Sequence, residues 1–329
     1  MMTPATDTGT RGEIVGASPV FLATLAQIRR VAASVAPVLI EGETGSGKEL
    51  AARAVHYWGE RNAGPFVPVN CGALPDHLLE AELFGHERGA FTDAKLARRG
   101  LVAEANGGTL FLDEVDSLSA KAQVALLRFL QDQRYRPLGS ARELSSDVRV
   151  IAATNQPLAE ATQQGRFRSD LLYRLKILHL VLPPLRERAG DAERLAQHFV
   201  TELCAKYHLP PKQFDAATLH WIGRHPWPGN VRELENWVHR ELLMADGLTI
   251  RVTLDTAERA DTLLPAIGTA SFQHAKAEAV RAFERDYVLA VMRQAGGNVT
   301  RAAQIAGKER RAFGKLIKRL GIDRQAFGA

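Results

Sequence analysis

The chain has 329 residues, of which 46% are hydrophobic and 24% charged, as in an ordinary globular protein of two or three domains. Its two cysteines, Cys71 and Cys204, are too few for a disulfide framework, so we expect a reducing, cytoplasmic setting. No stretch approaches the roughly 18 apolar residues that a membrane span needs, and we expect no membrane partner. Residues 1–13 lack the apolar core of a secretory signal, and we expect them to be disordered.

Positive charge is concentrated near the C-terminus. Residues 276–329 contain 12 Lys or Arg and 5 Asp or Glu, whereas residues 1–275 contain 30 Lys or Arg and 32 Asp or Glu. A nearly neutral body with a basic tail favours contact between the tail and a polyanion, in the first place nucleic acid. On charge alone, a basic surface that only aids solubility remains the alternative.

Short apolar runs alternate with helical patterns over residues 14–185. We expect strands at Val38–Ile40, Phe66–Val69, Thr109–Leu112, Val148–Ala153 and Ile177–Leu182. Helices are expected between them, among others at Lys48–Trp58 and Ala120–Gln131. This alternation predicts an α/β fold with a mainly parallel sheet that is flanked by helices.

The pattern becomes wholly helical after the last predicted strand. Asp191–Tyr207, Ala216–Arg224 and Val231–Met244 have helical spacing, which predicts a small helical subdomain over residues 186–245. Residues 246–275 have no strong period and are expected to form a linker. Residues 276–329 are again helical, and they form the third expected domain.

A glycine-rich segment at residues 42–48 reads GETGSGK and lies between a predicted strand and a predicted helix. In that context the pattern indicates a loop whose backbone N–H groups, together with the helix N-terminus, bind a polyphosphate. Lys48 is expected to reach the β- and γ-phosphates of ATP. The candidate nucleotide-binding residues here are Gly42, Glu43, Thr44, Gly45, Ser46, Gly47, Lys48 and Glu49. Glu49 stands where the general motif has a Ser or Thr that binds Mg²⁺, so the metal needs another contact.

Two adjacent carboxylates follow the predicted strand Thr109–Leu112, at the strand end where open α/β sheets bind ligands. We expect Asp113 to hold Mg²⁺ and Glu114 to polarise an attacking water. Thr154 and Asn155 end the next strand, where their polar groups are candidates for sensing the γ-phosphate. A simple strand-terminal turn explains this last pair nearly as well.

Six motifs follow one another along the chain: GETGSGKE from Gly42, FVPVNC from Phe66, ELFGHERGAFTDA from Glu82, FRSDLLYRL from Phe167, LPPLRER from Leu182 and WPGNVREL from Trp227. In this order they resemble the bacterial enhancer-binding proteins, which are AAA+ ATPases that activate RNA polymerase carrying sigma-54. The resemblance covers residues 14 to about 245, and this family carries Glu at the position of Glu49. It implies an AAA+ P-loop ATPase core with a helical lid.

The resemblance also implies roles for single residues. Asn70 resembles the switch asparagine that pairs with the catalytic glutamate, here Glu114. Arg168 and Arg174 resemble arginine fingers that reach the ATP of a neighbouring subunit, which implies a homo-oligomeric ring, a hexamer when active. Arg232 resembles the sensor arginine of the lid.

The segment Gly89, Ala90, Phe91, Thr92, Asp93 and Ala94 resembles the loop with which this family contacts sigma-54. Phe91 would supply an apolar anchor and Thr92 a hydrogen bond. The family has Gly where this chain has Asp93, which adds a negative charge and removes the conformational freedom of glycine. A second loop, Tyr135–Ser146, is expected beside the first.

The basic tail predicts a helix over Phe283–Met292 and then two short helices, Arg301–Ala306 and Lys308–Leu320. Thr300 is expected to cap the first of these two, and Gly307 to make the turn between them. The tail resembles the Fis-type helix-turn-helix domain of the same activators, which implies dimeric binding to inverted half-sites upstream of the promoter. The candidate DNA-binding residues are Arg301, Lys308, Arg310, Arg311, Lys315, Lys318 and Arg319.

Together these features favour an activator that binds upstream DNA and uses ATP hydrolysis to convert closed sigma-54 polymerase complexes to open ones. An ATP- and DNA-binding regulator that has lost remodelling through Asp93 is the alternative. A DNA motor or chelatase-like remodeller explains fewer motifs. The pattern begins by Ile14, so this sequence has no space for an N-terminal receiver domain. If the sequence is the full-length protein, control is expected from a separate regulatory protein, a related co-activator or expression level; a truncated chain would give the same pattern.

Overall fold

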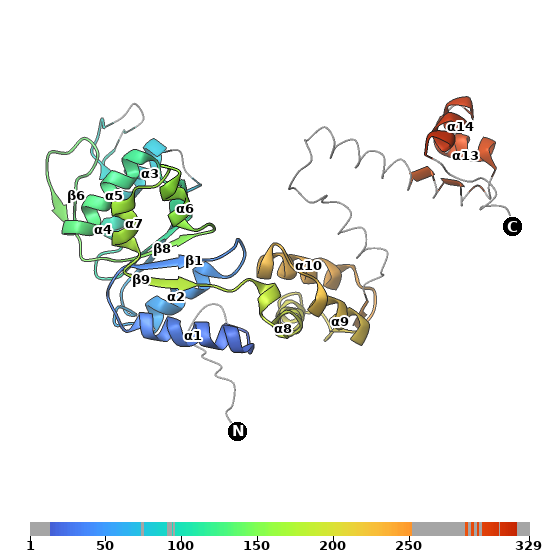
Figure 1. The fold of residues 1–329 in the computed structure, drawn as a ribbon, viewed down its shortest axis with the longest axis horizontal. Coiled ribbons are helices and arrows are strands. Elements are labelled where there is room, and N and C mark those ends of the chain that lie inside the picture. Colours follow the sequence, from blue (N-terminus) through green and yellow to red (C-terminus); the bar gives the residue numbers. More distant parts are fainter. Residues whose placement is uncertain are drawn as a thin grey trace, which may run out of the picture. The chain divides into compact units, whose positions relative to one another are not determined.

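The structure, a computed structural model, describes residues 14–73, 76–90, 94, 96–251, 287–288, 291–292, 295, 298–308 and 310–320 (Figure 1). For residues 76, 77, 318 and 319 it describes the backbone alone. The chain divides into two compact units, Met1–Arg251 and Val252–Ala329. The predicted disordered segment 1–13 and residues 252–275 of the predicted linker lie outside the described residues.

A five-stranded parallel sheet forms the centre of the first unit, with the strand order β2-β5-β8-β1-β9. Its strands are β1 (Val38–Glu41), β2 (Phe66–Asn70), β5 (Thr109–Asp113), β8 (Arg149–Thr154) and β9 (Leu178–Val181). All five predicted strands are therefore present, within one or two residues of the predicted bounds. Because the strands are parallel, their carboxyl ends meet at one edge of the sheet.

Helices cover both faces of this sheet (Figure 1). Helices α1 (Pro19–Ala32) and α2 (Lys48–Tyr57) pack on one face, and α3 (Asp76–Phe84), α4 (Leu101–Glu104), α5 (Ala120–Asp132), α6 (Leu158–Gln163) and α7 (Ser169–Leu175) pack on the other. The parallel α/β core predicted from the alternating pattern is confirmed.

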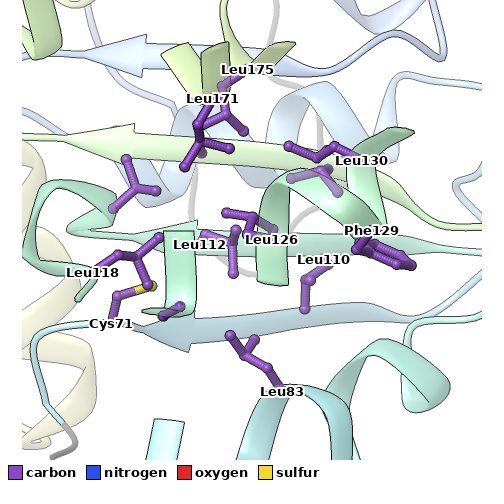
Figure 2. Packing of buried hydrophobic residues seen from close by; sticks show 14 of the residues in the cluster. Cys71, Leu83, Leu110, Leu112, Leu118, Leu126, Phe129, Leu130, Leu171 and Leu175 are labelled. Atoms are coloured by element: carbon purple, nitrogen blue, oxygen red, sulfur yellow. The ribbon is translucent and has the colours of Figure 1, made fainter. Parts of the chain in front are cut away.

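Successive residues of the strands point to opposite faces, and both faces are buried. In β5, Leu110 and Leu112 pack with Leu126 and Phe129 of α5, as Figure 2 shows, whereas Phe111 joins the cluster beneath α1 and α2. A strand that is buried on both faces reads as a continuous apolar run, which explains the pattern in the sequence. Burying one such apolar side chain stabilises the folded state by about 1.5–3 kcal/mol relative to leaving it exposed.

Two short antiparallel hairpins extend from this core. One pairs β3 (Gly85–His86) with β4 (Arg98–Arg99), and the other pairs β6 (Arg134–Tyr135) with β7 (Leu144–Ser145). Two backbone hydrogen bonds connect the first hairpin to the segment between β6 and β7. The N–H of Glu87 donates to the carbonyl of Leu138, and the N–H of Leu138 donates to the carbonyl of Gly85. The predicted second loop therefore lies beside the first.

The lid comprises α8 (Asp191–Lys206), α9 (Ala216–Arg224) and α10 (Asn230–Met244), which follow the short 3-10 turn η2 (Leu185–Glu187). Its core contains the fully buried Trp227, whose indole N–H donates to the carbonyl of Ile222 at 2.9 Å. The predicted three helices are confirmed. Beyond them, β11 (Thr249–Ile250) pairs in parallel with β10 (Gln213–Phe214), so residues 249–250 belong to this unit.

Two helices of the second unit lie wholly or almost wholly within the described residues, α13 (Val299–Ile305) and α14 (Arg310–Arg319), separated by a turn with Gly307 at φ +59°. Phe313 and Ile317 of α14 pack on Ala302 and Ala303 of α13. The expected cap was wrong: Asn298, not Thr300, caps α13, since its side-chain oxygen accepts from the N–H groups of Thr300 and Arg301. Among the helices that are described, none has the length and apolarity to cross a membrane.

Candidate active site

The glycine-rich loop joins the carboxyl end of β1 to α2, as the sequence predicts. Gly45 and Gly47 adopt φ values of +76° and +96°, a region that disfavours other residues. The Lys48 ammonium donates to the carbonyls of Gly42 at 2.8 Å and Glu43 at 3.1 Å. Lys48 is buried, and desolvation lowers its pKa, partly offset by the charge of Asp113. Its charge is therefore held inside the loop, beside the acidic strand end.

A cavity of about 360 Å³ lies between this loop and the ends of β2 and β5. Its lining brings together most of the residues that the sequence singled out, from three strand ends, the loop and the lid: Thr44, Gly45, Gly47, Lys48, Glu49, Asn70, Asp113, Glu114, Asn155 and Arg232. Opposite charges thus converge on one hollow at the carboxyl edge of a parallel sheet, where α/β proteins bind ligands.

Glu114 has a strained backbone, with φ +54°, and its N–H is within 3.0 Å of Asp113 Oδ1, which accepts from it. Non-glycine residues in this region are uncommon and gather at functional sites. The Asn70 side chain accepts from the N–H of Gly72 at 2.8 Å in this structure, and no hydrogen bond among the described residues joins it to Glu114. The pairing of Asn70 with Glu114 stays a prediction.

Thr154 and Asn155 have different places. Asn155 lines the cavity, whereas the Thr154 hydroxyl is buried and donates to Asp116 Oδ1 at 2.8 Å. Gln156 donates to the other oxygen of Asp116. In this structure Thr154 therefore fixes the loop after β5 to the end of β8 and does not line the cavity.

An apolar cavity of about 90 Å³ adjoins the other side of the loop, next to Gly47 and Leu50. Leu25 and Ile28 of α1, Phe199 of α8, and Ile14 and Val15 contribute to its lining. Such walls suit a flat, weakly polar ring such as a nucleobase. Sequence reasoning missed these residues, since apolar residues at helical spacing in α1 look the same whether they line a ligand pocket or fill a core.

The N-terminal strap, defined as residues 14–18, is held against this cavity by two buried residues of the lid. Asp191 accepts from the N–H groups of Ala17 at 2.7 Å and Ser18 at 3.0 Å. Arg188 pairs with Asp191 at 2.9 Å and donates to the Val15 carbonyl at 3.2 Å. The hydrogen bonds and this pairing lower the pKa of Asp191 in spite of desolvation, its largest single influence, which acts to raise it.

Comparison with known proteins shows the family to which this chain belongs. Residues 14–181 match the family described as the Sigma-54 interaction domain, and residues 186–257 match the AAA+ ATPase lid domain. The transcriptional regulatory protein GlrR of Escherichia coli K12 is 42% identical over 326 residues, covering 98% of this chain and 71% of the relative. ZraR of the same organism is 41% identical over 311 residues, covering 94% and 69%. This chain belongs to the sigma-54-dependent transcriptional regulators.

Solved structures agree with the family. NtrX of Brucella abortus in complex with ADP superimposes with a TM-score of 0.71 at 35% identity, covering 96% of this chain and 71% of that one. NtrX in complex with ATP gives 0.71 at 34% identity, with coverage of 94% and 70%. The protein is accordingly an AAA+ ATPase and a sigma-54-dependent transcriptional activator, and its predicted fold class and family are confirmed.

The residues of the cavity fit a nucleotide with its metal. The glycine loop presents backbone N–H groups and Lys48 to phosphates, and Asp113 supplies a carboxylate beside them. No cluster of three or more metal-binding side chains occurs within the described part of the chain. A divalent cation here would therefore depend on phosphate oxygens and water besides Asp113, as expected where Glu49 replaces the usual hydroxyl. Glu49 itself pairs with Arg53 at 2.7 Å.

Arg168 and Arg174 lie away from the cavity of their own chain. Arg168 precedes α7 and pairs with Asp170 at 2.6 Å, and Arg174, near the end of α7, donates to the Leu130 carbonyl at 3.4 Å. Both side chains are exposed. Neither lines the phosphate cavity of its own chain, and their role as arginine fingers stays a prediction.

The predicted sigma-54 loop is described in part. Gly89 has φ +82° and its N–H donates to the Ala94 carbonyl at 2.8 Å, which closes the base of the loop. Ala90 lies against Gly139 of the second loop, because a β-carbon on Gly139 would fall 2.9 Å from that of Ala90. Phe91, Thr92 and Asp93 lie outside the described residues.

In the second unit, five of the seven predicted DNA-binding residues are exposed: Arg301, Lys308, Arg310, Arg311 and Lys315. Lys315, Arg310 and Arg311 lie on α14, whose apolar side is held by Phe313 and Ile317. The side chains of Lys318 and Arg319 lie outside what the structure describes.

Proposed function

We propose that this protein hydrolyses Mg-ATP at subunit interfaces of a homohexameric ring and uses the energy to remodel sigma-54 polymerase from closed to open promoter complex. The observation that carries the proposal is the convergence of Lys48, Asp113 and Glu114 on one cavity between the phosphate loop and β5. Because the polymerase is its substrate, we place the protein in the cytoplasm.

Each side chain has a task that follows from its charge and place. Lys48 would exchange the carbonyls of Gly42 and Glu43 for β- and γ-phosphate oxygens when a nucleotide enters. Glu114 would hold and polarise the attacking water, and Asp113 would hold Mg²⁺. The bound metal supplies charge neutralisation at the phosphate oxygens. Arg168 and Arg174 of an adjacent subunit would stabilise the charge of the transferred phosphoryl group.

The remaining parts would couple hydrolysis to transcription. Asn70 ends β2, and Glu114 follows the neighbouring strand β5. Loss of the γ-phosphate would change the hydrogen bond that the Asn70 side chain makes, now with the N–H of Gly72. The segment Gly89–Ala94 would carry that movement to sigma-54 through Phe91 and Thr92. The exposed basic residues of α13 and α14 would bind DNA, with the C-terminal domains of two subunits forming a dimer. This dimer would hold the ring at an upstream DNA site.

Steady-state ATP hydrolysis tests the enzymatic part. Lys48→Ala should abolish both nucleotide binding and turnover, whereas Glu114→Gln should keep binding and lower turnover by about two orders of magnitude or more. Binding is followed with a fluorescent ATP analogue. Equal turnover in Glu114→Gln and the unmodified protein would contradict the role given to Glu114.

A further inference from the structure

Asn230 is a fully buried polar residue at the first turn of α10, and its carboxamide joins three separate segments. Its Nδ2 donates to Glu43 Oε2 and to the Thr44 carbonyl, both at 3.1 Å. Its Oδ1 accepts from the N–H of Leu185 at 2.8 Å. The side chain therefore connects the phosphate loop, the segment that leads into the lid, and α10 of the lid itself.

The backbone around Asn230 is equally close to the phosphate loop. The N–H of Val231 donates to the Gly45 carbonyl at 3.1 Å. A β-carbon on Gly45 would fall 2.2 Å from the Gly229 carbonyl oxygen, so nothing separates the loop from the start of α10. Arg186 adds two charged hydrogen bonds to Glu43, at 2.8 and 2.6 Å.

Arg232 follows Asn230 by two residues and reaches the phosphate cavity. It contributes to the lining of that cavity, and its Cβ lies 3.1 Å from where a β-carbon on Gly45 would be. Its charge acts on Lys48, lowering the pKa of that ammonium. The position of Arg232 is thus set by how the first turn of α10 sits on the phosphate loop.

We propose that Asn230 is the positioning residue for Arg232, holding the first turn of α10 on the phosphate loop through Glu43 and Thr44. The lid then follows the phosphate loop directly. Nucleotide entry at Lys48 is transmitted to Arg232 through Glu43, whose carbonyl Lys48 contacts and whose carboxylate Asn230 contacts.

The choice of asparagine follows from the geometry. Asn230 has φ +55°, a region that asparagine tolerates better than most residues. Only a carboxamide among small side chains can donate to two oxygens and accept from an N–H at once. Truncation would leave the buried Leu185 N–H and the Thr44 carbonyl without this partner, and an aspartate would set a second carboxylate against Glu43.

A double-mutant cycle tests the inference, which rests on the phosphate contact proposed for Arg232. Affinity for a fluorescent ATP analogue and ATPase KM and kcat are measured on the full chain for Asn230→Ala, Arg232→Ala and the double variant. Asn230→Ala should weaken nucleotide binding about tenfold, as should Arg232→Ala. In the Arg232→Ala background, Asn230→Ala should change affinity by less than about twofold, because the residue through which it acts is gone.

An equal loss from Asn230→Ala in both backgrounds would overturn the positioning role while leaving the ATPase intact. An Arg232→Ala variant with unchanged nucleotide affinity and kcat would overturn it as well. Failure of the unmodified protein to hydrolyse ATP would instead count against the proposed function, so the two failures are distinguishable.

If Asn230→Ala does not fold, a pair of charge-altering substitutions at positions 230 and 43 tests the same contact. Asn230→Asp should weaken nucleotide binding because two carboxylates face each other and the Thr44 carbonyl loses its donor. Adding Glu43→Gln should recover part of the loss by restoring an amide–carboxylate pair, while the contact with Thr44 stays broken. Glu43→Gln alone is the matched control. Recovery would support a direct link between these two positions, and its absence in a folded double variant would overturn it.

Discussion

The carboxylate of Glu114 lies directly against Gly72. A β-carbon at position 72 would fall 2.5 Å from Glu114 Oε2 and 3.4 Å from Asn70 Oδ1. Gly72→Ala should therefore push the Glu114 side chain aside and lower kcat by about 10–100-fold, since small displacements of a catalytic group have effects of this size. Nucleotide affinity should stay within about twofold, because Lys48 and the phosphate loop are untouched. Turnover and binding of an ATP analogue measure the two effects separately.

Gly247→Ala is the matched control for that variant. Gly247 lies in the turn before β11, and its nearest neighbour would be 4.0 Å from an added β-carbon. It should hydrolyse ATP at the unmodified rate. A Gly72→Ala variant with the same kcat as this control would show that Glu114 need not occupy its observed position.

Arg149 is a buried cation whose guanidinium bonds to the ends of two helices. It donates to the carbonyls of Val31 at 2.8 Å and Ala32 at 3.3 Å, near the end of α1, and approaches the Val55 carbonyl at 3.5 Å. Burial lowers its pKa to about 10, so it remains charged at neutral pH. Arg149→Met should destabilise the first unit by about 2–4 kcal/mol, because these carbonyls lose a charged donor.

Urea unfolding at pH 7 measures that loss, and Arg149→Lys is the control. Lysine keeps the charge but lacks the planar fork that reaches several carbonyls, so its loss should be smaller than that of methionine. A methionine variant as stable as the unmodified protein would contradict a stabilising role for the guanidinium.

The phosphate loop should respond to acid through Glu43. Hydrogen bonds from Arg186 and Asn230 lower the pKa of Glu43 from 4.5 to about 2. A carboxyl group with a lowered pKa stabilises the folded state above its unfolded pKa and loses that contribution as pH falls toward its folded pKa. The stability gap between the unmodified protein and Glu43→Gln should thus be full at pH 6 and shrink between pH 4.5 and pH 2. Urea unfolding across this range tests it; a gap that is independent of pH would refute the account.

The exposed positions of Arg168 and Arg174 lead to a mixing experiment. Arg168→Ala subunits would lack a finger, and Lys48→Ala subunits would lack a working nucleotide cavity, so each alone should have little ATPase activity. Mixed rings contain interfaces that combine an intact Lys48 with an intact Arg168 from the neighbour, and they should regain measurable turnover. Activity of the mixture no greater than the sum of its parts would argue against a finger supplied by another subunit.

Much of the fold could be predicted because its sheet is buried on both faces. In β5 and β8, continuous apolar runs mark the strands, and polar residues mark their ends at Asp113 and Asn155. The glycines of the phosphate loop are required by backbone angles, so they are legible in the sequence. These local signals located most of the phosphate cavity.

The rest depends on contacts between distant segments. Nothing near Ile14 in the sequence shows that the N-terminal strap will lie on Asp191, or that Asn230 will reach Glu43. Thr154 is predicted to sense the γ-phosphate because it ends a strand, and no local pattern shows that its hydroxyl donates to Asp116 of another segment. Asn298 precedes the predicted cap Thr300 by two residues, and only the geometry of α13 separates the two candidates.

Promoter opening tests the central claim most directly. Open-complex formation is measured on a sigma-54 promoter with purified protein, sigma-54 polymerase and hydrolysable ATP. The account predicts opening with the unmodified protein, ATP hydrolysis without opening for Thr92→Ala, and neither hydrolysis nor opening for Glu114→Ala. Hydrolysis by the unmodified protein without opening on several such promoters would contradict the account and point to Asp93 as the cause, with Asp93→Gly expected to restore opening.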